Sequence, residues 1–200
     1  MENFIKIFLP AYFIFYFAIA LVAKTLLVAK EIGKNPLVLP KDNTAYGLVG
    51  LYFKLIMVLL FVYVAVYAVF PDWYEYSLPI TQLENNIARY IGLTLLIFSL
   101  LWTIVAQNNM RTSWRIGIDT QTKTELITTG LFTVSRNPIF FGMIVSLVGL
   151  FLLTPNGLTA LIMILGYVLI QIQVRLEEEY LLNLHGETYC NYIKKVRRWI

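Results

Sequence analysis

Apolar runs long enough to cross a lipid bilayer are the feature that most restricts the fold of this chain. The first run, residues 4–29, is rich in Phe, Ile, Leu and Ala. At about 1.5 Å per helical residue, this run exceeds the roughly 30 Å thickness of a hydrocarbon core. The hydrophobic share of 58% also lies above the value of about 45–50% that is usual for soluble domains. The sequence therefore predicts an all-α integral membrane protein.

Four further apolar runs follow, and helix-breaking residues separate them. Gly33, Pro36 and Pro40 end the first run, and Pro71 ends the second. The last two runs are separated only by the turn sequence Thr-Pro-Asn-Gly, so we predict an antiparallel helical hairpin there. We expect about five transmembrane helices. The four later runs are residues 46–70, 87–106, 138–153 and 158–174.

The N-terminal run has an alternative interpretation as a cleaved signal peptide. The run is too long for one, and it contains Lys24 and no clear small-residue cleavage site. Lys24 lies near the end of the run, where its side chain can extend to the headgroups. We therefore expect a single membrane domain over residues 1–200, with three N-terminal membrane helices in residues 1–106.

The distribution of basic residues predicts the orientation of the chain. The loop of residues 71–86 has Asp72, Glu75 and Glu84 but no Lys or Arg. Five spans place the cation-bearing segments together on the other face, which the positive-inside rule assigns to the cytoplasm. We expect the N-terminus outside, the C-terminus in the cytoplasm, and a location in a bacterial inner membrane. These cations are Lys30, Lys34 and Lys41, then Arg111, Arg115, Lys123 and Arg136, then Arg175, Lys194, Lys195, Arg197 and Arg198.

Other classes of partner do not fit the composition. The net charge of +4 does not indicate nucleic-acid binding, because the cations are spread over separate loops and form no single stripe. Cys190 is the one cysteine, so an internal disulfide cannot form, and no clustered His or Cys residues are available for a metal. We expect the lipid bilayer as a partner and no metal.

A polar turn meets an apolar segment at Arg136, Asn137 and Pro138. Asn followed by Pro is typical of an N-cap and a first helical position, so we predict that a helix begins at about Pro138. Its free N–H groups and the charge of Arg136 suit a carboxylate or another anion. The alternative is that Arg136 only anchors the helix at the cytoplasmic surface.

The last apolar run becomes polar and ends in three consecutive glutamates, residues 177–179. Charges so near a bilayer are costly unless they are paired or hydrated. We expect Glu177 or Glu178 to pair with Arg136 or Arg175, or to bind a ligand ammonium group. The alternative is a solvated helix end that binds nothing.

After the glutamates, Gly186 is predicted to end the helix. Residues 187–198 are then predicted to form a short cytoplasmic amphipathic helix, with Tyr189, Tyr192 and Val196 on one side. Its cations suit either anionic headgroups or an anionic substrate.

Taken in order, these motifs resemble the isoprenylcysteine carboxyl methyltransferase family and the related membrane phospholipid N-methyltransferases. The family signatures are Arg-His-Pro-x-Tyr-x-Gly, Glu-Glu-x-x-Leu, and Phe-Gly-x-x-Tyr-x-x-Tyr followed by Arg-Val-Pro. The resemblance covers about residues 107–198. This chain departs from the signatures with Asn137 for His, Phe140 for Tyr, Lys195 for Arg and Arg197 for Pro. The matching residues are Arg136, Pro138, Gly142, Glu177, Glu178, Leu181, Gly186, Tyr189 and Tyr192.

The resemblance implies an S-adenosyl-L-methionine-dependent methyltransferase whose core is residues 107–200. The acceptor it implies is a lipophilic small molecule or lipidated substrate that enters from the bilayer. The implied catalytic residues are Glu178, Tyr192 and Lys195, of which Lys195 would hold an anionic acceptor group. The implied cofactor-binding residues are Leu126, Thr129, Gly130, Phe132, Arg136, Asn137, Pro138, Phe140, Gly142, Glu177, Glu178 and Tyr189.

Several activities remain open at this point. O-methylation of a carboxylate is the first expectation, and N-methylation of a phospholipid or small amine, or S-methylation of a thiol, is the alternative. A protonated amine needs a base, for which His185 or a glutamate is the candidate. A nicotinamide-dependent membrane reductase and a non-catalytic membrane protein are further alternatives, although the chain has no GxGxxG motif.

Overall fold

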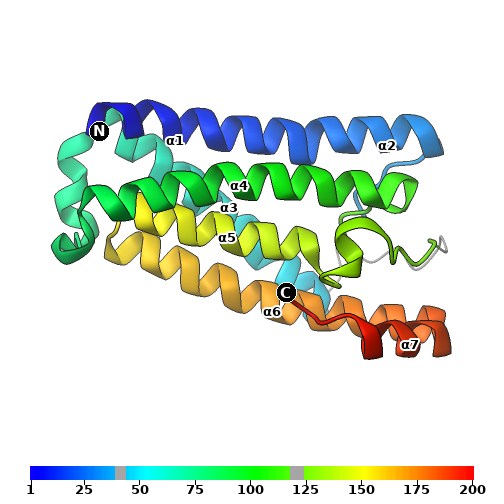
Figure 1. Ribbon diagram of the computed structural model, residues 1–200. Helices are drawn as coiled ribbons and strands as arrows, with labels where there is room; N and C mark the ends of the chain where they lie inside the picture. The colour runs from blue at the N-terminus through cyan, green and yellow to red at the C-terminus, as the bar shows by residue number, and fades with distance from the viewer. Residues whose placement is uncertain (39–43, 118–123) are drawn as a thin grey trace.

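The computed structural model describes residues 1–38, 44–117 and 124–200, so Pro40, Lys41 and Lys123 lie outside the described residues. The described residues form helices and no β-strand, with two isolated β-bridges between loops. Figure 1 shows the long helices side by side in one bundle. The α-helices are α1 Glu2–Phe17, α2 Lys24–Ile32, α3 Ala45–Val69, α4 Asn86–Met110, α5 Pro138–Leu153, α6 Gly157–His185 and α7 Glu187–Lys195.

Helices α1 and α2 form one continuous rod, joined by a π-helical turn at Ala18–Ala23 (Figure 1). Within this turn, the backbone oxygen of Ala20 accepts a hydrogen bond of 2.8 Å from the side-chain amide of Gln107 on α4. Gly33, at φ +69°, ends the rod in the left-handed conformation that glycine adopts at low cost. The first predicted span is therefore confirmed, and it extends to Ile32.

Local capping residues begin three of the other helices. The side chains of Thr44 and Asn85 accept backbone N–H groups at the starts of α3 and α4. Asn156 and Thr159 form a reciprocal capping box at the start of α6. The predicted hairpin of α5 and α6 is thus confirmed, with Thr154 to Asn156 as its turn.

The loops gather at two opposite ends of the bundle. At the acidic end, the loop of residues 71–85 bonds to the hairpin turn, from Ile80 N to Pro155 O at 2.9 Å and from Gly157 N to Leu78 O at 2.9 Å. At the basic end, Val38 N donates to Ile116 O at 2.8 Å and so joins the first linker to the segment after α4. The predicted grouping of the basic segments on one face agrees with this arrangement.

Glycines allow the backbones of helices α4 and α5 to come into direct contact. A Cβ atom on Gly92 would lie 2.8 Å from Gly149 O, and a Cβ on Gly142 would overlap the hydroxyl of Thr103. The indole N–H of Trp102 donates to Pro138 O at 2.9 Å. These contacts hold α5 against α4. They therefore position the start of α5, which Arg136 and Asn137 immediately precede.

In the part of the chain that the structure describes, four helical segments are long and apolar enough to cross a membrane: Glu2–Ile32, Ala45–Val69, Asn86–Ser113 and Gly157–His185. The expected fifth span, α5, has 16 residues and rises about 24 Å, which is less than the roughly 30 Å of a hydrocarbon core. The expected count of about five spans is therefore corrected to four full-length spans among the described residues, with α5 as a shorter apolar helix. Helix α5 is short because it begins at Pro138 and ends at Leu153, where Thr154 leaves the helical conformation before Pro155. The chain is an all-α, multi-pass membrane protein.

Candidate active site

Glu178 lies at the centre of a polar cluster at the basic end. Its Oε1 atom accepts hydrogen bonds from Asn137 Nδ2 at 2.9 Å and from Nε and Nη2 of Arg136 at 3.2 Å each. Its Oε2 atom accepts from Nη2 and Nε of Arg198 at 2.8 and 3.0 Å. Three segments of the chain, from the start of α5, the end of α6 and the C-terminal tail, therefore meet at one carboxylate.

The tail is tied to the same cluster through its backbone. Val196 O accepts from Arg136 Nη1 at 2.7 Å, and Arg197 O accepts from the backbone N–H of Arg136 at 2.9 Å. Arg198 O accepts from Ser135 Oγ at 3.2 Å. Helix α7 was predicted to reach Arg198 but ends at Lys195, because Val196 is extended and the carbonyls that follow bond to residues 135–137.

The charges in this cluster do not cancel. Arg136 and Arg198 each carry one positive charge and Glu178 carries one negative charge, so one positive charge remains. The side chains of Arg136 and Glu178 are only 9% and 10% exposed, whereas that of Arg198 is 34% exposed. The hydrogen bonds to Glu178 raise the pKa of Arg198. The cluster therefore carries a net positive charge, and Arg198 is its most exposed member.

Asn137 precedes α5 as predicted, but its side chain makes no N-capping hydrogen bond. Its amide instead donates to Glu178, and its backbone N–H donates to Ser135 Oγ at 3.1 Å. The predicted helix start at Pro138 is confirmed, whereas the predicted capping role of the Asn137 side chain is wrong. The charge-assisted hydrogen bond from Nδ2 to Glu178 holds the side chain in an orientation in which Oδ1 accepts no backbone N–H of α5.

A second set of contacts fixes the turn of residues 130–133 beside the cluster. Gly130 has φ +63°, and a Cβ there would overlap the side chain of Asn109, whose Oδ1 accepts from Leu131 N at 2.9 Å. Tyr192 donates from its hydroxyl to Phe132 O at 2.6 Å. Burial raises the pKa of Tyr192 to about 12, so the hydroxyl remains a donor at neutral pH.

The other predicted site residues form no hydrogen bond with Glu178. Glu177 is half-buried and accepts from Gln173 Nε2 at 2.8 Å, without an ion pair among the described residues. Tyr189 is buried on the inner face of α7. Leu126 and Thr129 precede the turn of residues 130–133, while Pro138, Phe140 and Gly142 lie in the first turns of α5. Lys195 is exposed at the end of α7 and does not touch Glu178.

Three residues that the sequence did not single out take part in the site: Asn109, Ser135 and Arg198. Arg198 was counted with the other basic residues of the tail, because residue spacing alone does not show which cation turns inward. Two consecutive polar residues, Asn108 and Asn109, at the end of an apolar run could have indicated a functional role for Asn109. No sequence pattern around Ser135 indicated that this residue belongs to the site.

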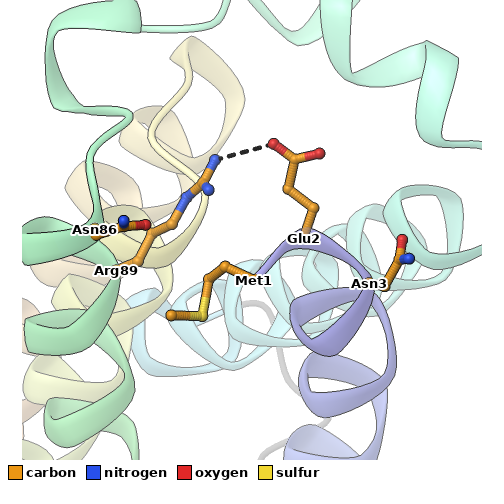
Figure 2. A pocket seen from close by; sticks show the side chains of 5 residues that line it. All are labelled: Met1, Glu2, Asn3, Asn86 and Arg89. Carbon is orange, nitrogen blue, oxygen red and sulfur yellow. Dashed lines mark hydrogen bonds and ion pairs between the residues drawn. The ribbon is translucent and has the colours of Figure 1, made fainter.

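A shallow pocket lies at the opposite end of the bundle and is separate from this cluster. Figure 2 shows its lining at the starts of α1 and α4, where Glu2 and Arg89 form an ion pair of 3.4 Å. Among the described residues, no group of three or more His, Cys, Asp or Glu side chains is arranged to hold a metal ion.

Comparison with known proteins gives a family match that covers Arg136, Asn137 and Glu178 and ends before Arg198. The family model described as phospholipid methyltransferase matches residues 87–188, which run from α4 into α7 and include Arg136, Asn137 and Glu178. No curated protein matches the chain. Because the family model covers half of the sequence, we conclude that this multi-pass membrane protein belongs to the phospholipid methyltransferase family.

Proposed function

We propose that this membrane methyltransferase uses S-adenosyl-L-methionine and that the cluster around Glu178 binds the amino-acid part of this cofactor. The observation that carries the proposal is the convergence of Arg136, Asn137 and Arg198 on the carboxylate of Glu178. The family model matches the region that contains Arg136, Asn137 and Glu178 and ends before Arg198. The proposed site faces the cytoplasm, in keeping with the basic loops around it. We further propose a bacterial inner membrane as the location.

The charges at the site fit an amino-acid group. Such a group presents one carboxylate and one ammonium, and the cluster offers two guanidinium groups and one carboxylate. We propose that the cofactor carboxylate binds Arg136 and Arg198, and that its ammonium binds Glu178 or Glu177. Charge-assisted hydrogen bonds of this kind contribute about 1.5–3 kcal/mol each.

The segment of residues 126–132 is the proposed adenosine side of the site. The turn at Gly130 to Thr133 is held rigidly by Asn109 and Tyr192, so its main-chain groups keep fixed directions. The ring of Phe132, which belongs to this turn, is buried, and so is the ring of Tyr189 on α7. The cofactor supplies an activated methyl group, and the residues of the chain contribute by orientation and by exclusion of water.

Two classes of acceptor are each favoured by a specific observation. The surplus positive charge of the cluster and the exposed Lys195 favour an anionic acceptor such as a lipidated carboxylate, which needs no base. Glu177 lacks a cation partner among the described residues and favours a protonated amine, for which a carboxylate can also accept the proton. The family description makes a phospholipid amine the specific form of this second candidate.

Thermal unfolding of the protein in detergent tests the cofactor. S-adenosylhomocysteine at about 100 times its Kd stabilises a binding protein by about 2.7 kcal/mol, whereas NADPH serves as the control ligand. Stabilisation by S-adenosylhomocysteine alone supports the proposal. Stabilisation by NADPH alone indicates a reductase, and stabilisation by neither compound contradicts a catalytic site for either cofactor.

Alkali treatment of the methylated product identifies the acceptor class. The protein is incubated with methyl-labelled cofactor and a membrane lipid extract, and the labelled lipid is then exposed to base. A methyl ester releases volatile methanol, whereas a methylated amine or thiol keeps its label. Release of the label supports O-methylation, and retention supports the second candidate.

A further inference from the structure

The tail of the chain has two faces with different partners. Its inner face carries Tyr189, Tyr192 and the backbone carbonyls that bond to Arg136. Its outer face carries three cations within four residues, and all three are exposed. Among the described residues none of the three forms an ion pair, so their charges are not compensated within the chain. We name them the tail cations: Lys194, Lys195 and Arg197.

The position of the tail relative to the apolar span places these cations near the bilayer surface. From Gly157 to Glu178, helix α6 rises about 32 Å at 1.5 Å per residue, which is close to the roughly 30 Å of the hydrocarbon core. Figure 1 shows that the chain reverses after α6 and that α7 runs back along it. Because Arg198 contacts Glu178, the residues just before Arg198 lie at the same level.

The surroundings of the tail cations match a lipid surface. Ile193 and Ile200, on either side of them, are exposed apolar residues at 37% and 55%. Cations and exposed aliphatic side chains on one short segment are typical of a segment that lies in the headgroup region. Anionic lipids attract such cations, and each cation strengthens the attachment by about fivefold.

We propose that the tail cations bind anionic phospholipid headgroups of the leaflet at the basic end, and that this contact orders the tail over the Glu178 cluster. The same few residues then have headgroups on their outer side and Arg136 and Glu178 on their inner side. Loss of the outer contact leaves the tail held by the inner contacts alone. The inference concerns the lipid contact, so it does not depend on the proposed cofactor.

The single cysteine provides a reporter without substitution, because Cys190 is exposed on α7. A nitroxide attached to Cys190 reports the mobility of the tail by electron paramagnetic resonance. The full-length protein is placed in nanodiscs of phosphatidylcholine alone or with about 30 mol% phosphatidylglycerol, a content at which the surface potential is strongly negative. We expect the anionic lipid to immobilise the label.

Two variants with equal loss of charge locate the effect. In the tail variant, Lys194→Gln, Lys195→Gln and Arg197→Gln remove the tail cations, and we expect the label to stay as mobile as in phosphatidylcholine. In the control variant, Lys30→Gln, Lys34→Gln and Arg111→Gln remove three exposed cations at the same end, and we expect the full response. The proposal is overturned if phosphatidylglycerol does not change the mobility of the label on the wild type. It is also overturned if phosphatidylglycerol immobilises the label on the tail variant as strongly as on the wild type.

Salt provides a test that needs no variant and therefore holds even if the tail variant does not fold. Near about 0.5 M salt the screening length is only a few ångströms, so an exposed electrostatic contact is weakened. We expect the lipid-induced immobilisation of the wild-type label to disappear at this salt concentration. A response to phosphatidylglycerol that persists unchanged there overturns the proposal.

Discussion

Asn137 donates a hydrogen bond of 2.9 Å from its side-chain amide to Glu178, a residue 41 positions further along the chain. The bond joins the first residue before α5 to the last turns of α6. Arg136 donates to the same oxygen, Oε1, at 3.2 Å, and more weakly to Oε2 at 3.4 Å. The hairpin thus brings a basic turn and an acidic helix end into contact at the membrane surface.

The first prediction concerns Arg136. We expect Arg136→Ala to weaken the binding of S-adenosylhomocysteine by roughly tenfold or more, because it removes charge-assisted hydrogen bonds of about 1.5–3 kcal/mol each. Isothermal titration calorimetry on the purified protein measures this change. Arg175→Ala is the control, since Arg175 bonds to Gln171 on its own helix and lies outside the cluster. Equal affinities of the wild type and Arg136→Ala would place the cofactor elsewhere.

The second prediction concerns Gly142. We expect Gly142→Ala to destabilise the fold by about 1–3 kcal/mol, because the added Cβ overlaps the hydroxyl of Thr103. Gly50→Ala on α3 is the matched control, since no atom lies near its added Cβ. Thermal unfolding in detergent should show a lower Tm for Gly142→Ala only. The double variant Gly142→Ala and Thr103→Ala should recover part of the loss, and no recovery would argue against this contact.

The third prediction concerns Tyr192. We expect Tyr192→Phe to lower the free energy of unfolding by about 1–3 kcal/mol, because the buried carbonyl of Phe132 loses its donor. Tyr76→Phe at an exposed position is the control. If Tyr192 also positions the turn of residues 130–133, the variant will bind S-adenosylhomocysteine more weakly. A variant with wild-type stability would mean that this hydrogen bond contributes nothing.

The fourth prediction concerns Lys195. We propose that Lys195 orients an anionic acceptor, so Lys195→Ala should abolish turnover and leave cofactor affinity nearly intact. Single-turnover methyl transfer at saturating cofactor measures the first effect, and calorimetry measures the second. Lys194→Ala is the neighbouring control. A rate for Lys195→Ala within about twofold of the wild type would leave lipid binding as the only role of this lysine, since tenfold corresponds to 1.36 kcal/mol.

The fifth prediction concerns orientation. The loop of residues 71–85 should face away from the cytoplasm, because it carries no Lys or Arg. In a Cys190→Ser background, a cysteine introduced by the exposed substitution Glu75→Cys should react with an impermeant reagent added outside intact cells. The native Cys190 should react only after the membrane is opened. The reverse pattern would invert the topology.

The sequence predicted the local features of the fold because they depend on neighbouring residues. Pro138 begins α5, Gly186 follows the end of α6, and the turn before Gly157 joins the hairpin. The expected number of spans was too high, since the apolar run at residues 138–153 is shorter than a bilayer core. Its length was visible in the sequence, but it was counted as a span because it is a continuous apolar run, and the distribution of basic residues over the loops agreed with five spans.

The contacts of the site were less predictable because they join distant segments. The pairing of Glu178 with Arg136 was one of several pairings that the charges allowed, and the structure contains it. The role of Arg198 depends on where α7 ends, and the sequence placed that end three residues too late. Asn137 was expected to cap its own helix, since a local pattern cannot show that a carboxylate from α6 lies beside it.

Methyl transfer by the protein and two adjacent glutamate variants tests the central claim most directly. The wild type, Glu178→Gln and Glu179→Gln are incubated in nanodiscs with methyl-labelled S-adenosyl-L-methionine and a membrane lipid extract. Glu179 is exposed on the turn that also carries the buried Glu178, so both substitutions remove one carboxylate from the same helix. We predict that the wild type and Glu179→Gln label a lipid, and that Glu178→Gln retains less than about a tenth of the rate, a loss of at least 1.36 kcal/mol. Equal rates for the two variants, or no labelled product from the wild type, would contradict a methyltransferase site at Glu178.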